Sequence, residues 1–191
     1  MTLHADARAV LGAWTAPDAG QEELRRSYLD HLDAHPDAMW RTCLPGHLTA
    51  SSAIISADGS KVALVLHRVH RMWLQTGGHC ETEDATLAAA ALREATEESG
   101  IRGLTLLPAP VRLDRHAVPC GGGSFHLDVQ YAALAPADAV LVVDPAESAG
   151  LDWFPVDELP EPSDDVVRDL VRTAARAVRA DRAGQSDPRP A

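Results

Sequence analysis

The chain has 191 residues, of which 46% are hydrophobic and 24% are charged, so it is long enough to bury a core within one domain. Its formal net charge of -11 argues against nucleic acid or an anionic membrane surface as the main partner, because long-range repulsion would slow such encounters. A small phosphate ligand would need a local cation. The charge balance therefore favours bound metal over a general basic surface.

The cysteines Cys43, Cys80 and Cys120 are odd in number and widely spaced, which fits neither a disulfide framework nor a paired zinc-ligand pattern. The spacing of His116, Cys120 and His126 also matches no compact zinc motif. The N-terminus lacks a basic region followed by an apolar run, and no segment approaches the roughly 18 apolar residues of a membrane helix. We therefore expect a soluble, cytoplasmic protein.

The first half of the chain predicts a helix followed by a hairpin. Residues 21–35 place apolar side chains at helical spacing, and Pro36 ends the pattern. Residues 48–56 and 61–69 predict two strands, joined by a turn at Asp58-Gly59.

The second half predicts further strands between two helices. Residues 86–99 are rich in alanine and glutamate and predict a helix that Gly100 closes as a left-handed cap. The last helix is expected at residues 163–180, with Ser163 as its cap. The intervening strands are predicted at residues 104–113, 124–135 and 151–154.

This order predicts an α+β fold, with a mixed strand region around a central helix. We expect an N-terminal helical extension over residues 1–46, a main domain over residues 47–182 and a disordered tail over residues 183–191. The extension either covers a substrate pocket or forms a homodimer interface.

The helix at residues 86–99 carries a cluster of carboxylates. Glu94, Glu97 and Glu98 are spaced at i, i+3 and i+4, so their side chains share one face. Like charges at this spacing cost roughly 0.2–0.5 kcal/mol per pair, and a divalent cation would relieve the repulsion. Magnesium and manganese prefer such oxygen ligands. The alternative interpretation of these glutamates is a solvated helix face.

The wider segment resembles a known motif. It reads Gly77-Gly78-His79-Cys80-Glu81-Thr82-Glu83-Asp84 and, after eight residues, Arg93-Glu94-Ala95-Thr96-Glu97-Glu98-Ser99-Gly100-Ile101. This closely resembles the Nudix box, in which a glycine, five residues, an acid and seven residues precede R-E-apolar-x-E-E-x-G-apolar. The second half matches at every position, whereas the loop after Asp84 is one residue longer. The resemblance extends loosely over residues 48–159 and implies a Nudix-type αβα sandwich with a mixed sheet, flanked by the N-terminal extension and the C-terminal helix.

The resemblance also implies roles for the matching residues. Glu97 and Glu98 would bind metal, and Glu94 would be a further ligand or the base that activates water. Arg93 would orient these glutamates. The backbone carbonyl of Gly77 corresponds to the carbonyl ligand of the family, and a glycine lets the backbone approach a metal and its phosphates closely.

Other residues are weaker candidates. Glu147, in the loop before the last strand, either completes the metal site or is a solvated carboxylate. Asp128 is the second choice for completing the site and is also a candidate to bind substrate, because it shares one face of its strand with His126. A buried hydrogen-bonded pair is the alternative interpretation of these two residues. Gly78 and His79 are candidates for contact with substrate phosphates, although His79 would serve equally well as a hydrogen-bonding loop residue. The early acidic position of the box stays open among Asp84, Glu81 and Glu83.

The resemblance implies a hydrolase that uses Mg²⁺ or Mn²⁺ to cleave a phosphoanhydride bond. The expected substrate is a nucleoside diphosphate linked to another moiety, such as the sugar nucleotide ADP-ribose, or a nucleoside triphosphate. Two alternatives stay open: a nucleotide-sensing domain of the same fold without turnover, and an enzyme similar to prenyl-diphosphate isomerases with Cys80 as its thiol. All three glutamates of the box are present, and this favours hydrolysis over both.

Overall fold

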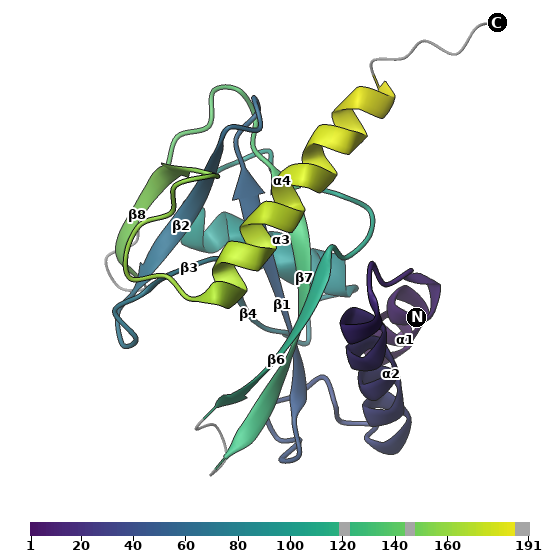
Figure 1. Cartoon of the computed structure of the whole chain (residues 1–191). Coiled ribbons are helices and arrows are strands. Elements are labelled where there is room, and N and C mark those ends of the chain that lie inside the picture. The colour runs from purple at the N-terminus through teal and green to yellow at the C-terminus, as the bar shows by residue number, and fades with distance from the viewer. Residues whose placement is uncertain (119–122, 144–147, 186–191) are drawn as a thin grey trace, which may run out of the picture.

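The structure is a computed structural model that describes residues 1–118, 123–143 and 148–185. Two N-terminal helices, α1 (Leu3–Ala13) and α2 (Ala19–Ala34), precede a sheet region that contains α3 (Leu87–Ser99), and α4 (Asp165–Gln185) follows it (Figure 1). The strands are β1 (His47–Ile55), β2 (Lys61–His67), β3 (Trp73–Leu74), β4 (Thr76–His79), β5 (Thr105–Leu106), β6 (Arg112–Val118), β7 (Ser124–Leu134) and β8 (Ser148–Pro155). Among these described residues, no helix combines the length and apolarity needed to cross a bilayer.

The strands form one mixed sheet. β1 and β7 run parallel in its centre, with His47 opposite His126 at the start of the paired region. β1 also pairs antiparallel with β2 and with β4, while β7 pairs antiparallel with β5 and β6. β2 continues the sheet through β3 and β8. The expected mixed sheet is therefore confirmed.

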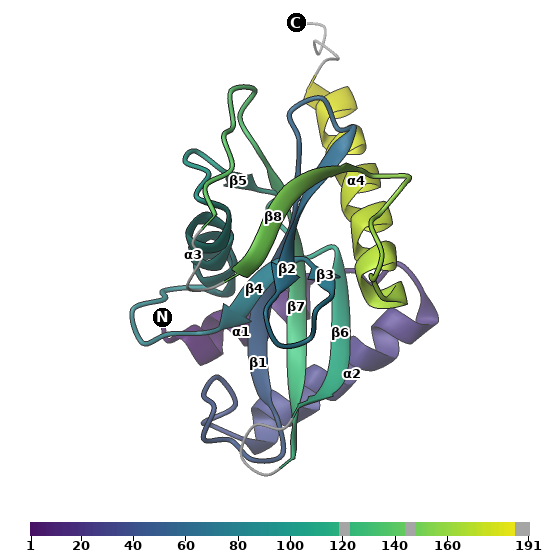
Figure 2. The same cartoon turned by 90° about the vertical axis from the view of Figure 1, so that its left-hand side faces the viewer.

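Helices cover both faces of this sheet, as Figure 2 shows for α3 and α4. Successive side chains of β1 point to opposite faces: Ile54 packs with residues of α3, whereas Ala53 and Ile55 pack with residues of α4. α1 and α2 join α3 in a further buried cluster against β1, β6 and β7. This arrangement confirms the αβα sandwich.

The N-terminal extension is bonded to the rest of the domain. The side-chain amide of Gln21 both donates to the carbonyl of Leu113 (3.0 Å) and accepts from its N–H (2.6 Å), so α2 is tied to β6. The Tyr28 hydroxyl donates to the carbonyl of Asp114 on the same strand. The Asp6 carboxylate on α1 accepts the N–H of Leu87, the first residue of α3, at 2.8 Å. The extension therefore contacts the helix that carries the glutamate cluster.

Several expected elements need correction. The strand predicted at residues 104–113 is wrong, because Pro108 and Pro110 lie between the short β5 and the longer β6, and proline has no N–H for a ladder. Asp164, rather than Ser163, caps α4, since its carboxylate accepts the N–H of Val167 at 2.8 Å. α4 also extends to Gln185, into the region expected as the tail.

Other predicted elements are confirmed. The hairpin forms from β1 and β2, and Ile55 pairs with Val62 across it. The helix at residues 86–99 forms as α3, and Gly100 ends it at φ 66° in the left-handed region. The strand at residues 124–135 forms as β7. α1, β3 and β4 lack counterparts among the predicted elements.

Candidate active site

α3 is held in place at its N-terminal end. The Thr86 hydroxyl accepts the N–H of Ala89 at 3.0 Å, and the Asp6 carboxylate accepts the N–H of Leu87. A carboxylate at a helix N-terminus also interacts favourably with the helix dipole. The buried side of α3 consists of small and apolar side chains, Leu87, Ala90, Ala91 and Ala95. The helix is therefore a fixed support for the charged residues on its other side.

Two glutamates of α3 meet the glycine pair of β4. The N–H of Gly77 donates to Glu98 Oε2 at 3.0 Å. A Cβ added to Gly78 would lie 2.7 Å from Glu94 Oε1, so any side chain there would have to displace the Glu94 carboxylate. Gly77 itself has φ 155°, and a Cβ there would lie 2.3 Å from Cβ of Ser51. The glycines thus allow two carboxylates to lie directly against the backbone of one short strand.

The three glutamates differ in exposure. The Glu94 side chain is 16% exposed, whereas that of Glu97 is 53% exposed. Burial raises the pKa of Glu94, and its hydrogen bond with the Arg93 guanidinium partly offsets this effect. A half-buried carboxylate with a raised pKa suits a group that takes a proton from water. It would also be stabilised by a nearby cation.

Arg93 joins the parts of the site. Its guanidinium donates to Glu94 Oε1 at 2.9 Å and to Glu97 Oε2 at 3.1 Å on the same helix. It also donates to the backbone carbonyl of His79 on β4 at 3.0 Å, and to both oxygens of Asp84 at 3.0 and 3.2 Å. One side chain therefore fixes α3 against β4 and the loop that follows it, and the orienting role of Arg93 stays a prediction.

The structure places Asp84, among the acids left open for the early position, against Arg93. Its side chain is 5% exposed, and Oδ2 also accepts the N–H of Glu81 at 2.8 Å. Glu81 is itself exposed, and its carboxylate lies 3.8 Å from Arg93. Glu83 is exposed and bonds to Thr82. Asp84 is therefore the buried partner of the arginine in this loop.

The remaining candidates have different surroundings. Asp128 is 2% exposed, and its carboxylate accepts hydrogen bonds from Thr49 (2.9 Å), Ser51 (2.6 Å) and Gln130 (3.0 Å). Burial raises its pKa, and these hydrogen bonds act in the opposite direction. Substrate contact by Asp128 stays a prediction. Glu147 lies outside the described residues.

A group of histidines beside the glycine pair has no counterpart in the sequence predictions. Nε2 of His79 lies 3.1 Å from Nε2 of His47, and the ring of His126 lies 4.8 to 4.9 Å from both rings. Burial lowers the pKa of His79 to about 4 and that of His126 to about 3, so the uncharged rings predominate at neutral pH. Spacing along the chain could not reveal this group, because its members come from three different strands.

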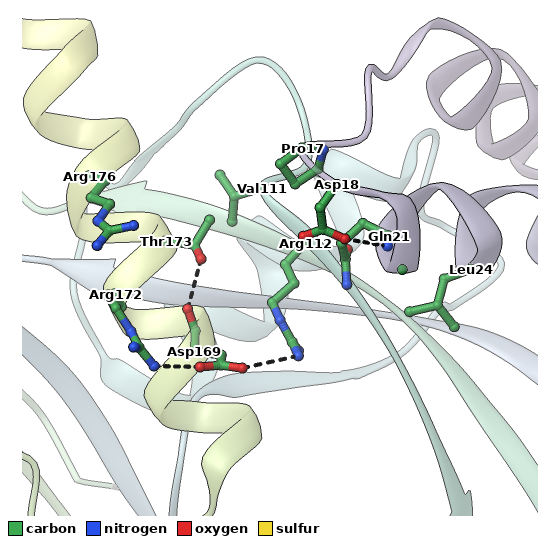
Figure 3. A pocket seen from close by; sticks show the side chains of 11 residues that line it. Pro17, Asp18, Gln21, Leu24, Val111, Arg112, Asp169, Arg172, Thr173 and Arg176 are labelled. Carbon is green, nitrogen blue, oxygen red and sulfur yellow. Dashed lines mark hydrogen bonds and ion pairs between the residues drawn. The ribbon is translucent and has the colours of Figure 1, made fainter.

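A polar hollow of about 490 Å³ lies elsewhere, between the start of α2, β6 and α4 (Figure 3). It contains three arginines, Arg112, Arg172 and Arg176. Arg112 and Arg172 both form ion pairs with Asp169. None of the Nudix-box residues lines this hollow, which is therefore separate from the candidate active site.

The donor chemistry of the glutamate cluster suits a hard divalent cation. Its donors are the carboxylates of Glu94, Glu97 and Glu98 and the backbone of Gly77, and oxygen ligands of this kind suit Mg²⁺ and Mn²⁺. The space is kept open by glycines in which a Cβ would collide with Glu94 or Ser51. The charge cluster, the raised pKa of Glu94 and the close approach of backbone to carboxylate are all consistent with a metal-dependent reaction at phosphate.

Comparisons with known proteins agree with this geometry. The sequence profile of the NUDIX domain matches residues 46–174. A comparison with curated protein sequences finds no significant match.

Similar solved structures include a NUDIX-family hydrolase from Clostridium perfringens (23% identity, 70% of this chain, 97% of that chain, TM-score 0.56). The NUDIX domain of NrtR from Shewanella oneidensis, complexed with ADP ribose, is also similar (20% identity, 78% of this chain, 97% of that chain, TM-score 0.55). A UDP-X diphosphatase is similar over 93% of this chain and 91% of its own chain (16% identity, TM-score 0.55). At these identities the likeness establishes a shared fold. Since the profile covers more than half of the sequence, the chain belongs to the Nudix hydrolase family.

Proposed function

We propose that the protein is a hydrolase that depends on Mg²⁺ or Mn²⁺ and cleaves a phosphoanhydride bond in a nucleoside diphosphate linked to another moiety. The observation that carries this proposal is the convergence of Glu94 and Glu98 on the backbone of Gly77 and Gly78. Three carboxylates on one helix face repel one another, and the single guanidinium of Arg93, which pairs with Glu94 and Glu97, offsets only part of their charge. The site is therefore built for positive charge and for the phosphates that accompany it.

In this mechanism Glu97, Glu98 and the carbonyl of Gly77 would hold the metal. When bound, the cation would lower the pKa of water and polarise a phosphoryl oxygen. Arg93 engages Oε1 of Glu94, so we assign Oε2 as the oxygen that receives the proton of the attacking water. The same guanidinium keeps Glu94 in position through its bonds to Asp84 and His79.

Two similar proteins support the choice of substrate class. One was crystallised with ADP ribose, and the other is named for its action on UDP-X. Both ligands are nucleoside diphosphates joined to a second group. The likeness to the UDP-X diphosphatase also includes the N-terminal extension, since it covers 93% of this chain. Sugar nucleotides such as ADP-ribose are therefore the first compounds to test, followed by nucleoside triphosphates.

The isomerase alternative requires a reactive thiol, and Cys80 is poorly suited to that role. Its side chain is 7% exposed, and burial raises the pKa of the thiol to about 12. A thiol in such surroundings stays protonated and unreactive at neutral pH. The non-catalytic alternative is disfavoured by the presence of all three glutamates of the box.

A phosphate-release screen over nucleotide substrates, with and without Mg²⁺ or Mn²⁺, tests the proposal. We expect Glu94→Gln to lower kcat by about 10²–10⁴-fold, the usual contribution of a positioned base. Glu83→Gln is the matched control, because Glu83 is an exposed acid in the loop that precedes α3. Metal-dependent turnover that survives both Glu97→Gln and Glu98→Gln would contradict the site assignment. Tight nucleotide binding without hydrolysis of any substrate would instead support the sensing alternative.

A further inference from the structure

Three imidazole rings meet where β1, β4 and β7 lie side by side. His47 pairs with His126 in the parallel ladder of β1 and β7. His79 is the last residue of β4 and pairs with Thr49, two residues along β1 from His47. Residues two apart on a strand face the same side, so the three rings share one face of the sheet. Their ligand nitrogens all lie within 4.8 Å of one another.

The separations are close to those of a metal site. Two nitrogens bound to a tetrahedral ion at about 2.0–2.1 Å lie roughly 3.3 Å apart. Nε2 of His47 and Nε2 of His79 are 3.1 Å apart, already near this value. His47 is fully buried and its Nε2 faces that of His79, while the His79 and His126 rings are half-buried. The third nitrogen needs only side-chain movement to reach the same centre.

We propose that His47, His79 and His126 form a second metal site, which binds a transition-metal ion of the zinc class. Imidazole nitrogen suits Zn²⁺, Cu²⁺ and Ni²⁺, whereas carboxylate and carbonyl oxygens suit Mg²⁺ and Mn²⁺. The two sites of the molecule therefore select different ions by the chemistry of their donors. Three histidines leave a fourth position for water, as in zinc sites with three protein ligands.

A hydrogen bond between two neutral imidazoles is the competing explanation for the contact of His47 with His79. It would account for the 3.1 Å distance, but it would not require a third ring beside the pair. His126 lies with its ring 4.9 Å from that of His47 and 4.8 Å from that of His79, edge-on to both. A common ion explains the convergence of all three rings.

The histidine site is connected to the glutamate site through β4. His79 directly follows Gly77 and Gly78, and its carbonyl accepts a hydrogen bond from Arg93 at 3.0 Å. An ion bound to the His79 ring would therefore restrain the strand against which Glu94 and Glu98 lie. We expect occupancy of the histidine site to stabilise this strand without replacing the ion held by the glutamates.

The test measures Zn²⁺ binding to the full chain, from which metal has first been removed with a chelator. Titration calorimetry in excess Mg²⁺ gives the affinity for Zn²⁺. The absorption spectrum of bound Co²⁺ reports whether the ligands are nitrogens. The wild type should bind one Zn²⁺ per chain under these conditions. His79→Gln and His126→Gln should each weaken binding by more than about tenfold, since even loss of a ligand's outer partner has that effect. His70→Gln, at an exposed histidine outside the cluster, and Glu98→Gln should leave Zn²⁺ affinity unchanged.

These variants also distinguish the two metal sites. Equal Zn²⁺ affinity in the wild type and in the double variant of His79 and His126 would overturn the proposal. Loss of Zn²⁺ binding in Glu98→Gln would overturn it as well, because the ion would then occupy the carboxylates. His47→Gln is only a supplementary variant, because His47 is fully buried and its replacement can disturb folding. Circular dichroism checks that every variant is folded. Failure of the hydrolase assay alone would leave these binding results unaffected.

Discussion

Replacement of Asp84 by asparagine removes the charge beside Arg93 while the shape of the side chain is kept. The carboxylate accepts three hydrogen bonds: two from Arg93, at 3.0 and 3.2 Å, and one from the N–H of Glu81 at 2.8 Å. An asparagine side chain has one acceptor oxygen and one donor group. In either orientation the amide would therefore point an N–H toward another N–H, in a place where the Asp84 side chain is 5% exposed.

The expected loss of stability follows from these contacts. A hydrogen bond to a charged group contributes about 1.5–3 kcal/mol, and removal of one partner of a buried ion pair costs about 3–5 kcal/mol. Arg93 is 20% exposed and keeps its bonds to Glu94 and Glu97, so the loss should be smaller than that of a fully buried pair. We expect Asp84→Asn to lower the free energy of unfolding by about 2–3 kcal/mol.

Urea denaturation measures this difference, provided that the slope of the transition does not change. Glu83→Gln serves as the control and should change stability by less than about 0.5 kcal/mol, as is usual for an exposed position. kcat should also fall in Asp84→Asn, because Arg93 loses its ion pair with Asp84 and holds Glu94 and Glu97 less firmly. A stability loss no larger than that of the control, or a larger loss in Glu81→Gln, would refute this account of the loop.

Three further changes test other contacts. Gly78→Ala should lower kcat by roughly 10²-fold with little change in melting temperature, because the new methyl group displaces the flexible carboxylate of Glu94 rather than the backbone. Asp6→Ala removes the acceptor for the first N–H of α3 and should cost about 1 kcal/mol, or about 2–4 °C in a thermal scan. In a variant that carries Cys43→Ala and Cys120→Ser, Cys80 is the remaining thiol. It should resist alkylation at about pH 8 and react in urea, because its folded-state pKa of about 12 keeps the thiol protonated. Rapid alkylation of this variant in its folded state would contradict the prediction.

The local part of the site was predictable from the sequence. Glu94, Glu97 and Glu98 are neighbours on one helix, so their common side follows from helical periodicity alone. The end of that helix at Gly100 was predictable for the same reason, since a glycine can adopt the left-handed conformation that its φ of 66° confirms. Both inferences use contacts within one turn of the chain.

The strand that receives these glutamates was not predictable. β4 contains two adjacent glycines, which have low strand propensity and give no alternation of apolar and polar residues. Its extended form depends on pairing with β1, four residues against four, and on the carboxylates of α3. The acid that fills the early position of the box was similarly ambiguous. Asp84 and its neighbours are all carboxylic acids, and they differ in burial, which the sequence does not show.

The histidine cluster shows why spacing along the chain is the wrong criterion for ligands carried by a sheet. A compact zinc motif is recognised by short spacings along the chain, and the spacing of His116, Cys120 and His126 matches none. In a sheet, side-chain alternation determines which residues face the same side, but strand register determines which of them are neighbours. A slip of β7 by one residue against β1 would move His126 to the opposite face, away from His47. The cluster is therefore a consequence of the long parallel pairing of β1 and β7, and a variant that weakened this pairing would disperse the three rings even with every histidine retained.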